Sequence, residues 1–203
     1  MKPLYQNLTG ALLTLALMVA VPSALAAEKT PQAIVEQATV DMLATVKKHN
    51  AAGKKTDAYY ADVRKTLEAV VDFPFIAKAV MRKSVKTATP EQMEKFIAVF
   101  KNGLIKTYAK GIANYADSTI KTLPVSMAAD VRRISVDQEV SDKGATHKLS
   151  YTLILNDAGE WKLINVVLNG VNLGESFTSQ FDQAMIKNDK NIDKVIETWL
   201  AAS

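Results

Sequence analysis

The chain has 203 residues, a hydrophobic fraction of 48%, a net charge of +4 and no cysteine. Without thiols it can form no disulfide, thiolate metal site, cysteine nucleophile or lipid-modified cysteine anchor. The positive charge is mild and spread along the chain, and the lysines are not interleaved with aromatic residues, so the sequence gives no support for a nucleic-acid partner. At this length we expect one domain with a substantial core.

The N-terminal segment has the three parts of an export signal. Lys2 supplies a positive charge, residues 8–22 (LTGALLTLALMVAVP) form an apolar run, and residues 24–26 (ALA) form a small-residue cleavage motif. We therefore expect a secretory signal peptide over residues 1–26, cleaved after Ala26, and a single domain over residues 27–203 outside the cytoplasm. The alternative is an uncleaved membrane anchor, but the apolar run is short for a spanning helix.

Helix signals dominate the first half of this domain. Thr30 and Pro31 suit the N-cap and the first position of a helix, and residues 49–56 (HNAAGKKT) break the apolar spacing that follows. A second apolar helical face runs over residues 59–70. Residues 72–74 (DFP) then mark a boundary, because a residue before proline avoids the helical conformation. We expect two helices before this boundary and a short one after it.

The clearest helix signal lies at residues 89–92 (TPEQ). Threonine at the N-cap, proline at the first position and glutamine at the third form a capping box. Apolar residues then recur at steps of three and four and make one stripe over about six turns. Its members are Met93, Phe96, Ile97, Phe100, Leu104, Tyr108, Ile112 and Tyr115. Core packing against a sheet is the common explanation of such a stripe, and the alternative is that part of it lines a ligand cavity.

From about Arg132 the periodicity changes to two, which indicates strands. Three strands joined by short loops follow, at residues 133–140, 147–156 and 161–169, with loops over 141–146 and 156–160. In the middle strand the alternation places four apolar side chains on one face: Leu149, Tyr151, Leu153 and Leu155. Two more helical patterns close the chain. Helices, then a meander, then helices predict an α+β fold in which helices pack on a mostly antiparallel sheet.

A search for catalytic or metal-binding groups finds little. His49 and His147 stand alone, without a second imidazole at ligand spacing, and we interpret them as surface histidines. Asp137 and Glu139 share the strand face that points to solvent, where nothing shifts a pKa for acid–base work. Residues 170–176 (GVNLGES) lack the Gly-Lys-Ser/Thr of a phosphate loop. Abundant apolar surface without catalytic groups favours a binding protein, with an apolar ligand held in a cavity between the helices and the sheet.

A series of short motifs runs in order through most of the domain. They are Asp72-Phe73, Thr89 to Gln92, Phe96 with Phe100, Leu104 with Tyr108-Ala109, Gly170 to Leu173, and Gln180-Phe181. In order and spacing this series resembles the MlaC-like, toluene-tolerance family of periplasmic phospholipid carriers. Three positions depart from the family pattern, because Asn165, Asn169 and Asn172 stand where it usually has aspartate, glutamate and serine.

The resemblance implies a soluble periplasmic shuttle that buries phospholipid acyl chains in a hydrophobic pocket. Such a carrier takes phospholipid between an outer-membrane lipoprotein complex and an inner-membrane ABC transporter and thereby serves outer-membrane lipid asymmetry. It hydrolyses nothing and needs no cofactor or metal. A soluble carrier must keep the acyl chains out of water, because each acyl CH₂ exposed to water costs roughly 0.8 kcal/mol.

Twelve residues are the predicted lining of this pocket, although each also suits an ordinary core. They are Phe73, Ile76, Val80, Phe100, Leu104, Tyr108, Val136, Tyr151, Leu153, Val167, Val171 and Phe177. We expect the glycines at positions 170 and 174 to bend the last strand at one edge of the pocket.

Two alternatives stay open. The first is a cavity-bearing α+β enzyme acting on a small apolar substrate, with Tyr108 and either Asp117 or Asn165 as its polar pair. The second is a periplasmic interaction module whose core is fully packed.

Overall fold

The computed structural model describes residues 29–50 and 56–201, so the predicted signal peptide lies outside the described residues. The α-helices in this part are α1 (Pro31–Asn50), α2 (Asp57–Val70), α3 (Phe73–Met81), α4 (Pro90–Ile112), α5 (Leu173–Lys187) and α6 (Ile192–Ala201). The strands are β1 (Thr119–Thr122), β2 (Arg133–Asp142), β3 (Ala145–Leu155), β4 (Trp161–Leu168) and β5 (Val171–Asn172). Within these ranges no helix has the length and apolar character needed to cross a membrane.

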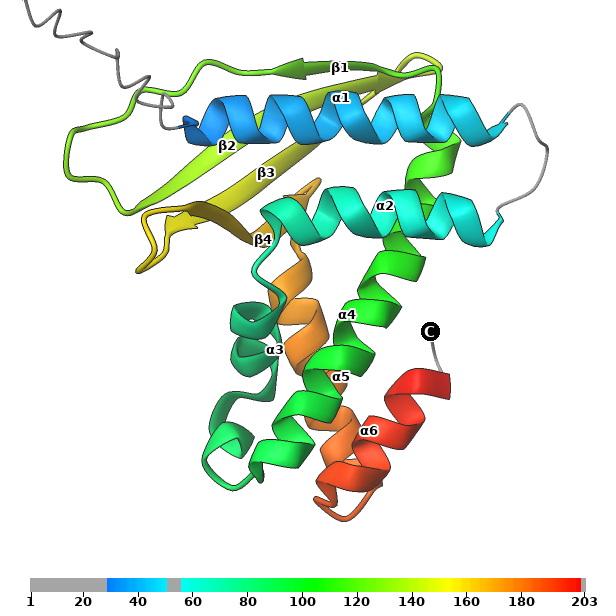
Figure 1. Cartoon of the computed structure of the whole chain (residues 1–203), viewed down its shortest axis with the longest axis vertical. Helices are drawn as coiled ribbons and strands as arrows, with labels where there is room; N and C mark the ends of the chain where they lie inside the picture. Colours follow the sequence, from blue (N-terminus) through cyan, green and yellow to red (C-terminus); the bar gives the residue numbers. More distant parts are fainter. Residues whose placement is uncertain (1–28, 51–55, 202–203) are drawn as a thin grey trace, which may run out of the picture.

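The strands form one antiparallel sheet in the order β1-β2-β3-β4-β5. Figure 1 shows the sheet with α1 and α2 at one end of the molecule and α3, α5 and α6 at the other, while α4 runs from one end toward the other. The predicted α+β fold and its antiparallel sheet are confirmed. The edge strands β1 and β5 were not predicted, because strands of four and two residues carry too little alternation to be recognised.

Side chains begin the helices where the sequence predicts them. The hydroxyl of Thr30 accepts a hydrogen bond from the backbone N–H of Ala33 at the start of α1. At the start of α4 the Thr89 hydroxyl accepts from the Gln92 N–H, and the Gln92 side chain accepts from the Thr89 N–H. The predicted capping box is therefore present. These bonds satisfy N–H groups that have no partner within the helix.

Two hairpins turn on two-residue loops of the same type. In the β2–β3 hairpin, Lys143 and Gly144 have φ of 46° and 83°, and in the β4–β5 hairpin Asn169 and Gly170 have φ of 48° and 84°. Two successive left-handed residues match the twist of the flanking strands, and asparagine or glycine tolerates this conformation best. The six-residue loop expected over 141–146 is thus wrong, because both strands continue up to the turn.

Three packed clusters make up the interior. The helical core joins α3, α4, α5, α6 and one residue of β4, and consists of Ile76, Ala77, Val80, Met81, Phe96, Val99, Phe100, Ile164, Phe181, Ile192, Val195 and Ile196. The hairpin core joins α1, α2, α3 and α4, and consists of Met42, Val46, Tyr59, Val63, Phe73, Ile105 and Ala109. The sheet core joins α1 to the sheet, and consists of Val35, Val136, Leu153 and Trp161.

Aromatic rings at the centre of the helical core hold its helices together. Phe96 of α4 meets Phe181 of α5 edge-on, with ring centroids 5.2 Å apart, and meets Trp199 of α6 at 5.5 Å. Such contacts add roughly 0.5–1.5 kcal/mol each to the free energy that burial already contributes. Helix α4 is thereby fixed to both C-terminal helices.

The capping box predicts a measurable effect on folding. Replacing Thr89 with alanine should lower the free energy of unfolding by about 1 kcal/mol, because the Gln92 N–H loses its acceptor. Urea denaturation followed by circular dichroism measures this change. The matched control is Thr107→Ala, an exposed position within α4, where we expect no loss of stability. Equal destabilisation by both substitutions would contradict the role assigned to the cap.

Candidate functional site

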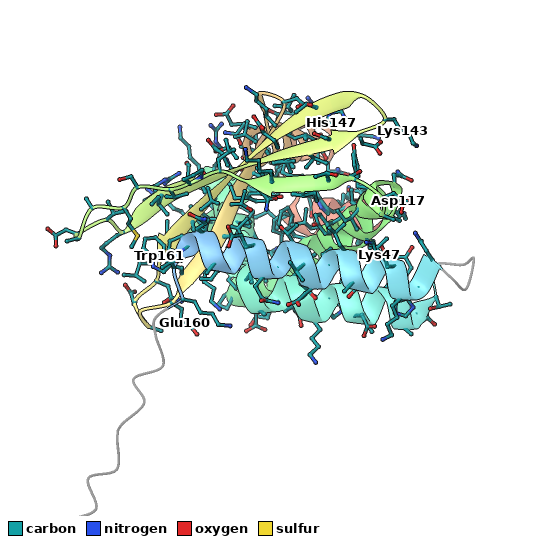
Figure 2. The ribbon with its side chains drawn as sticks, turned by 90° about the horizontal axis from the view of Figure 1, so that it is seen from above. Lys47, Asp117, Lys143, His147, Glu160 and Trp161 are labelled. Carbon is teal, nitrogen blue, oxygen red and sulfur yellow. The ribbon has the colours of Figure 1, made fainter. Side chains whose placement is uncertain are left out.

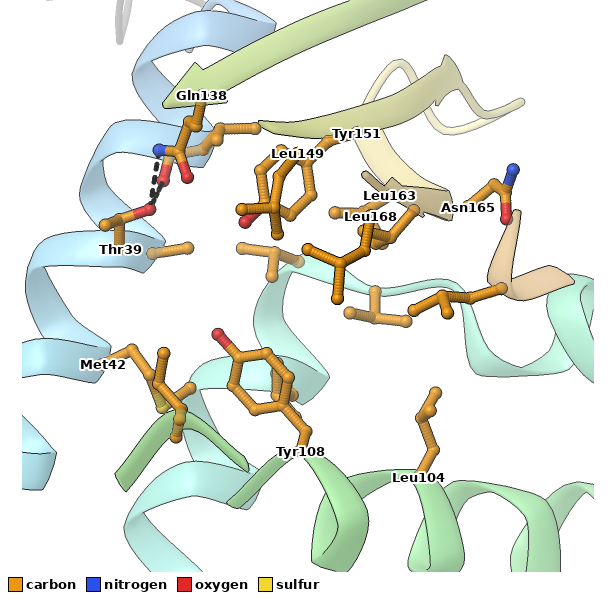
Figure 3. A pocket seen from close by; sticks show the side chains of 18 of the residues that line it. Thr39, Met42, Leu104, Tyr108, Gln138, Leu149, Tyr151, Leu163, Asn165 and Leu168 are labelled. Carbon is orange, nitrogen blue, oxygen red and sulfur yellow. Dashed lines mark hydrogen bonds between the residues drawn. The ribbon is translucent and has the colours of Figure 1, made fainter. Parts of the chain in front are cut away.

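An apolar cavity of about 300 Å³ lies between the sheet and the helices. Side chains from β1, β2, β3 and β4 form one wall, and side chains from α1, α2, α3, α4 and α5 form the other. Figure 3 shows Leu149, Tyr151 and Leu163 on the sheet side and Met42, Leu104 and Tyr108 on the helix side, with space between them. The interaction module with a fully packed core is therefore excluded.

The three packed clusters meet at this cavity and supply part of its lining. Ile76 belongs to the helical core, Met42 to the hairpin core and Leu153 to the sheet core, and all three line the cavity. Many other lining residues, such as Leu149 and Val166, are only partly buried although they are apolar. This is the pattern of side chains that face an internal space rather than packed neighbours.

A β-bulge decides which side chains of β4 face the cavity. The register between β3 and β4 shifts at Thr152/Leu153, so that Leu153 pairs with Leu163 but Thr152 pairs with Asn165. One extra residue in β4 reverses the alternation beyond it. The cavity wall consequently continues with Val166 and Leu168.

The predicted lining residues divide into two groups. Those that line the cavity are Phe73, Ile76, Leu104, Tyr108, Tyr151, Leu153 and Phe177. Those that do not are Val80, Phe100, Val136, Val167 and Val171. That the first group contacts a lipid stays a prediction.

Each misplaced residue has a physical reason. Val80 and Phe100 are buried inside the helical core, and Val136 is buried in the sheet core. Val167 would face the cavity in a regular strand, but the bulge turns it to the other face. Val171 lies beyond the Asn169-Gly170 turn and is 55% exposed.

The N-terminal helices contribute a wall that the lining prediction missed. Ile34, Ala38 and Met42 of α1 and Leu67 of α2 line the cavity. Their helical spacing is visible in the sequence, but an apolar stripe looks the same whether it meets a core or a cavity. Leu149 also lines the cavity and was not among the predicted lining residues. The sequence did place it on the same strand face as Tyr151, and this alternation indicates its position in the wall.

Polar groups are few in the cavity, and the most buried one, Gln138, uses both of its amide donors within the protein. Gln138 is 2% exposed, and its amide donates to the hydroxyls of Thr39 on α1, at 2.9 Å, and Thr122 on β1, at 3.0 Å (Figure 3). These bonds tie α1 to the sheet across the end of the cavity. The Thr39 hydroxyl in turn donates to the carbonyl of Val35.

Two tyrosines present hydroxyls to the same space. Burial, followed by the neighbouring Tyr59, raises the pKa of Tyr108 to about 12. Burial, followed by Tyr108, also raises the pKa of Tyr151. Both phenols are therefore neutral at any physiological pH, because the apolar surroundings penalise the phenolate.

The polar pair of the enzyme alternative is not assembled. Asp117 is exposed and does not line the cavity, and Figure 2 shows it near the β2–β3 turn, at the end of the molecule marked by His147 and Lys143. Asn165 lines the cavity, but its Oδ1 accepts a hydrogen bond from the Gly174 N–H at 3.0 Å. Tyr108 thus has neither proposed partner in a catalytic role.

The histidines are less exposed than expected. The His49 side chain is 14% exposed and lies 2.9 Å from Asp62, and hydrogen bonds from His49 and Lys48 lower the pKa of Asp62 to about 2. His147 is half-buried at the cavity and lies 3.0 Å from the Asn169 amide. In the part of the chain that the structure describes, no group of three or more histidines or carboxylates could hold a metal ion.

The three asparagines noted in the sequence all hold the junction between β4 and α5. Besides the bond from Asn165 to Gly174, the Asn172 side chain accepts from the Glu175 N–H and caps α5. Asn169 takes the left-handed turn position, and its Oδ1 accepts from the Lys148 N–H at 2.9 Å. The expected bend is therefore a hairpin turn at Gly170 followed directly by a capped helix.

Gly174 is needed for space rather than for an unusual φ. A Cβ at this position would lie 2.7 Å from Asn165 Oδ1, closer than real contacts allow. The glycine lets the second residue of α5 approach the cavity wall and donate its N–H to Asn165. The glycine and the asparagine thus form one structural unit at the edge of the cavity.

Comparison with known proteins gives this architecture a family. The family model described as MlaC protein matches residues 36–201, which is most of the chain. The chain belongs to the MlaC family. The resemblance read from the sequence motifs is confirmed.

Two individual relatives match most of the chain in sequence. The chain is 36% identical over 188 residues to the toluene tolerance protein ttg2D of Pseudomonas putida, covering 91% of this chain and 86% of that protein. It is 25% identical over 174 residues to the intermembrane phospholipid transport system binding protein MlaC of Haemophilus influenzae, covering 84% and 80%.

A solved structure shares the fold. The phospholipid-binding protein from Ralstonia solanacearum, in complex with a phospholipid, superimposes with a TM-score of 0.72 at 27% sequence identity. The match covers 85% of this chain and 95% of that one. The arrangement of helices around a five-stranded sheet is thus shared with a protein that has been seen with lipid bound.

The Gly174–Asn165 unit yields a prediction. Gly174→Ala should lower the free energy of unfolding by about 1–3 kcal/mol, because the new methyl group displaces Asn165 and leaves the Gly174 N–H without its acceptor. The control is Gly111→Ala in α4, where a Cβ meets nothing within 4 Å and alanine should be neutral or slightly stabilising. Chemical denaturation of both variants measures the difference, and similar effects at the two glycines would refute the steric argument.

Proposed function

We propose that this protein is a soluble periplasmic carrier that binds phospholipid acyl chains in the cavity between its sheet and helices. The observation that carries the proposal is the cavity itself, an apolar space of about 300 Å³ in the middle of the domain. Membership of the MlaC family and the lipid-bound relative from Ralstonia solanacearum support the same conclusion.

The lining suits hydrocarbon. Leu104, Leu149 and Phe177 offer apolar surface from three different elements, and the most buried polar side chain, Gln138, has its amide donors satisfied within the protein. Each CH₂ moved from water into such a site gains roughly 0.8 kcal/mol. The volume lies at the lower end for ligand pockets, so a second acyl chain would require the walls to part.

Export and partners extend this proposal. A signal peptide over residues 1–26, cleaved after Ala26, would deliver the domain of residues 27–203 to the periplasm. There it would move lipid between an outer-membrane lipoprotein complex and the substrate-receiving subunit of an inner-membrane ABC transporter. The name of the Haemophilus influenzae relative, a binding protein of an intermembrane phospholipid transport system, supports this role. We propose binding without catalysis, because Tyr108 lacks the acid–base partner that an enzyme site would supply.

The direct test is the lipid content of the protein. Purified under non-denaturing conditions from a bacterial host that exports it, the protein should show masses of bound phospholipid in native mass spectrometry. Solvent extraction should release the same lipids in amounts comparable with the protein. Folded protein that repeatedly carries no lipid, and that takes up none from vesicles, would refute the carrier proposal.

A charge placed in the cavity should remove lipid. Leu104 is half-buried and faces the cavity, so Leu104→Arg should cut the bound lipid at least tenfold, since a guanidinium stays charged and strongly disfavours hydrocarbon beside it. Val40→Arg, at a residue of α1 that is 60% exposed, is the matched control and should leave lipid binding unchanged.

Leu104 is a better position for this substitution than a fully buried lining residue, because the protein should still fold. Leu153 also lines the cavity, but it is fully buried in the sheet core, so arginine there should unfold the protein rather than empty it. Thermal unfolding of each variant separates the two effects. A folded Leu104→Arg variant with the lipid content of the unmodified protein would place the lipid outside this cavity.

A further inference from the structure

Two tyrosine hydroxyls enter the apolar cavity from opposite walls. Tyr108 projects from α4 and Tyr151 from β3, and Figure 3 shows both hydroxyls pointing into the space between the walls. Across the described residues, neither hydroxyl has a hydrogen-bond partner in the protein. These two donors are thus aimed at whatever fills the cavity.

Three other polar side chains of the lining, Thr39, Thr66 and Gln138, differ from these two. The hydroxyls of Thr39 and Thr66 donate to backbone carbonyls of their own helices. The amide of Gln138 donates to two hydroxyls. The donors of these groups are used in hydrogen bonds within the protein, whereas the hydroxyls of Tyr108 and Tyr151 are not.

Tyr59 shows how this chain treats a tyrosine that only packs. It is 2% exposed in the hairpin core, and its hydroxyl donates to the carbonyl of Ala109 at 2.6 Å. That carbonyl lies in the last turn of α4, where no partner is available within the helix. A buried hydroxyl left without such a partner costs roughly 1–3 kcal/mol. If Tyr108 and Tyr151 packed only against hydrocarbon, phenylalanine would avoid that cost.

The chemistry of the two phenols indicates which kind of ligand group they would bind. Each is neutral, because burial raises its pKa, and each can donate one O–H. A neutral donor in an apolar site is suited to an uncharged acceptor, since a buried anion would need a cation or several donors. The acyl ester carbonyl of a phospholipid is such an acceptor and lies where the hydrocarbon tail begins.

We propose that Tyr108 and Tyr151 form a carbonyl-binding subsite, which holds the acyl ester group of the lipid and makes the cavity prefer ester-linked over ether-linked lipids. This inference rests on the proposed carrier function. It adds a polar anchor to a mostly apolar cavity, and it fixes how far the tails enter.

The test compares two lipids that differ only in the carbonyls. Delipidated protein is loaded with a fluorescent phospholipid, which is then displaced by diacyl phosphatidylethanolamine or by the dialkyl ether analogue with the same head group and chain lengths. We expect the diacyl lipid to compete roughly tenfold better, the ratio that one good buried hydrogen bond gives. In Tyr108→Phe/Tyr151→Phe the ratio should fall to about one, with the ether lipid binding as well as before.

Tyr59→Phe is the matched control. It also removes a buried tyrosine hydroxyl, but one outside the cavity lining, so stability should fall while the ester-to-ether ratio stays unchanged. Circular dichroism shows that each variant is folded.

The remaining outcomes overturn one proposal or both. Equal binding of the two lipids by the unmodified protein overturns the subsite and leaves the carrier function intact. An ester preference that survives in the double variant overturns the assignment to these tyrosines. Failure of the folded, unmodified protein to bind either lipid overturns the carrier function as well.

Discussion

The structure depends on keeping an apolar space open inside a small domain. The hydrophobic effect favours collapse of such a space, and its walls lose dispersion contacts for as long as it is empty. The chain resists collapse by dividing its interior into the helical, hairpin and sheet cores, each closely packed in itself. Because the cavity lies where the three cores meet, closing it would require at least one of them to repack, and packed interiors yield little to deformation.

Helix α4 connects two of these cores and also lines the cavity. It contributes Phe96 and Phe100 to the helical core, then Ile105 and Ala109 to the hairpin core, and between them it presents Leu104 to the cavity. Its 23 residues give a rod about 35 Å long. A single rigid helix therefore holds two cores at a fixed separation, and the capping box at Thr89 stabilises its exposed beginning.

The sequence predicts the elements of this fold better than it predicts the cavity wall. The helix starts at Thr30, Asp72 and Thr89 depend on local capping residues, which can be recognised in the sequence. The wall depends on register. Regular alternation from Trp161 would put Val167 in the wall, but the single extra residue of the β4 bulge, which no local motif indicates, puts Val166 there instead. Phe100 and Leu104 share one stripe, and only tertiary packing decides that the first is core and the second lining.

The junction between β4 and α5 shows how the edge of the cavity is held without charge. Asn165, Asn169 and Asn172 stand where the family resemblance leads one to expect aspartate, glutamate and serine, and each uses an amide oxygen to accept a backbone N–H. A carboxylate would accept these bonds more strongly, but Asn165 borders an apolar cavity, where a charge is costly to desolvate. An amide oxygen keeps its bond at any pH, whereas a carboxylate loses strength as an acceptor when it is protonated. The three backbone N–H groups at the hairpin turn and the start of α5 are therefore held by acceptors that do not titrate, next to a space whose contents must come and go.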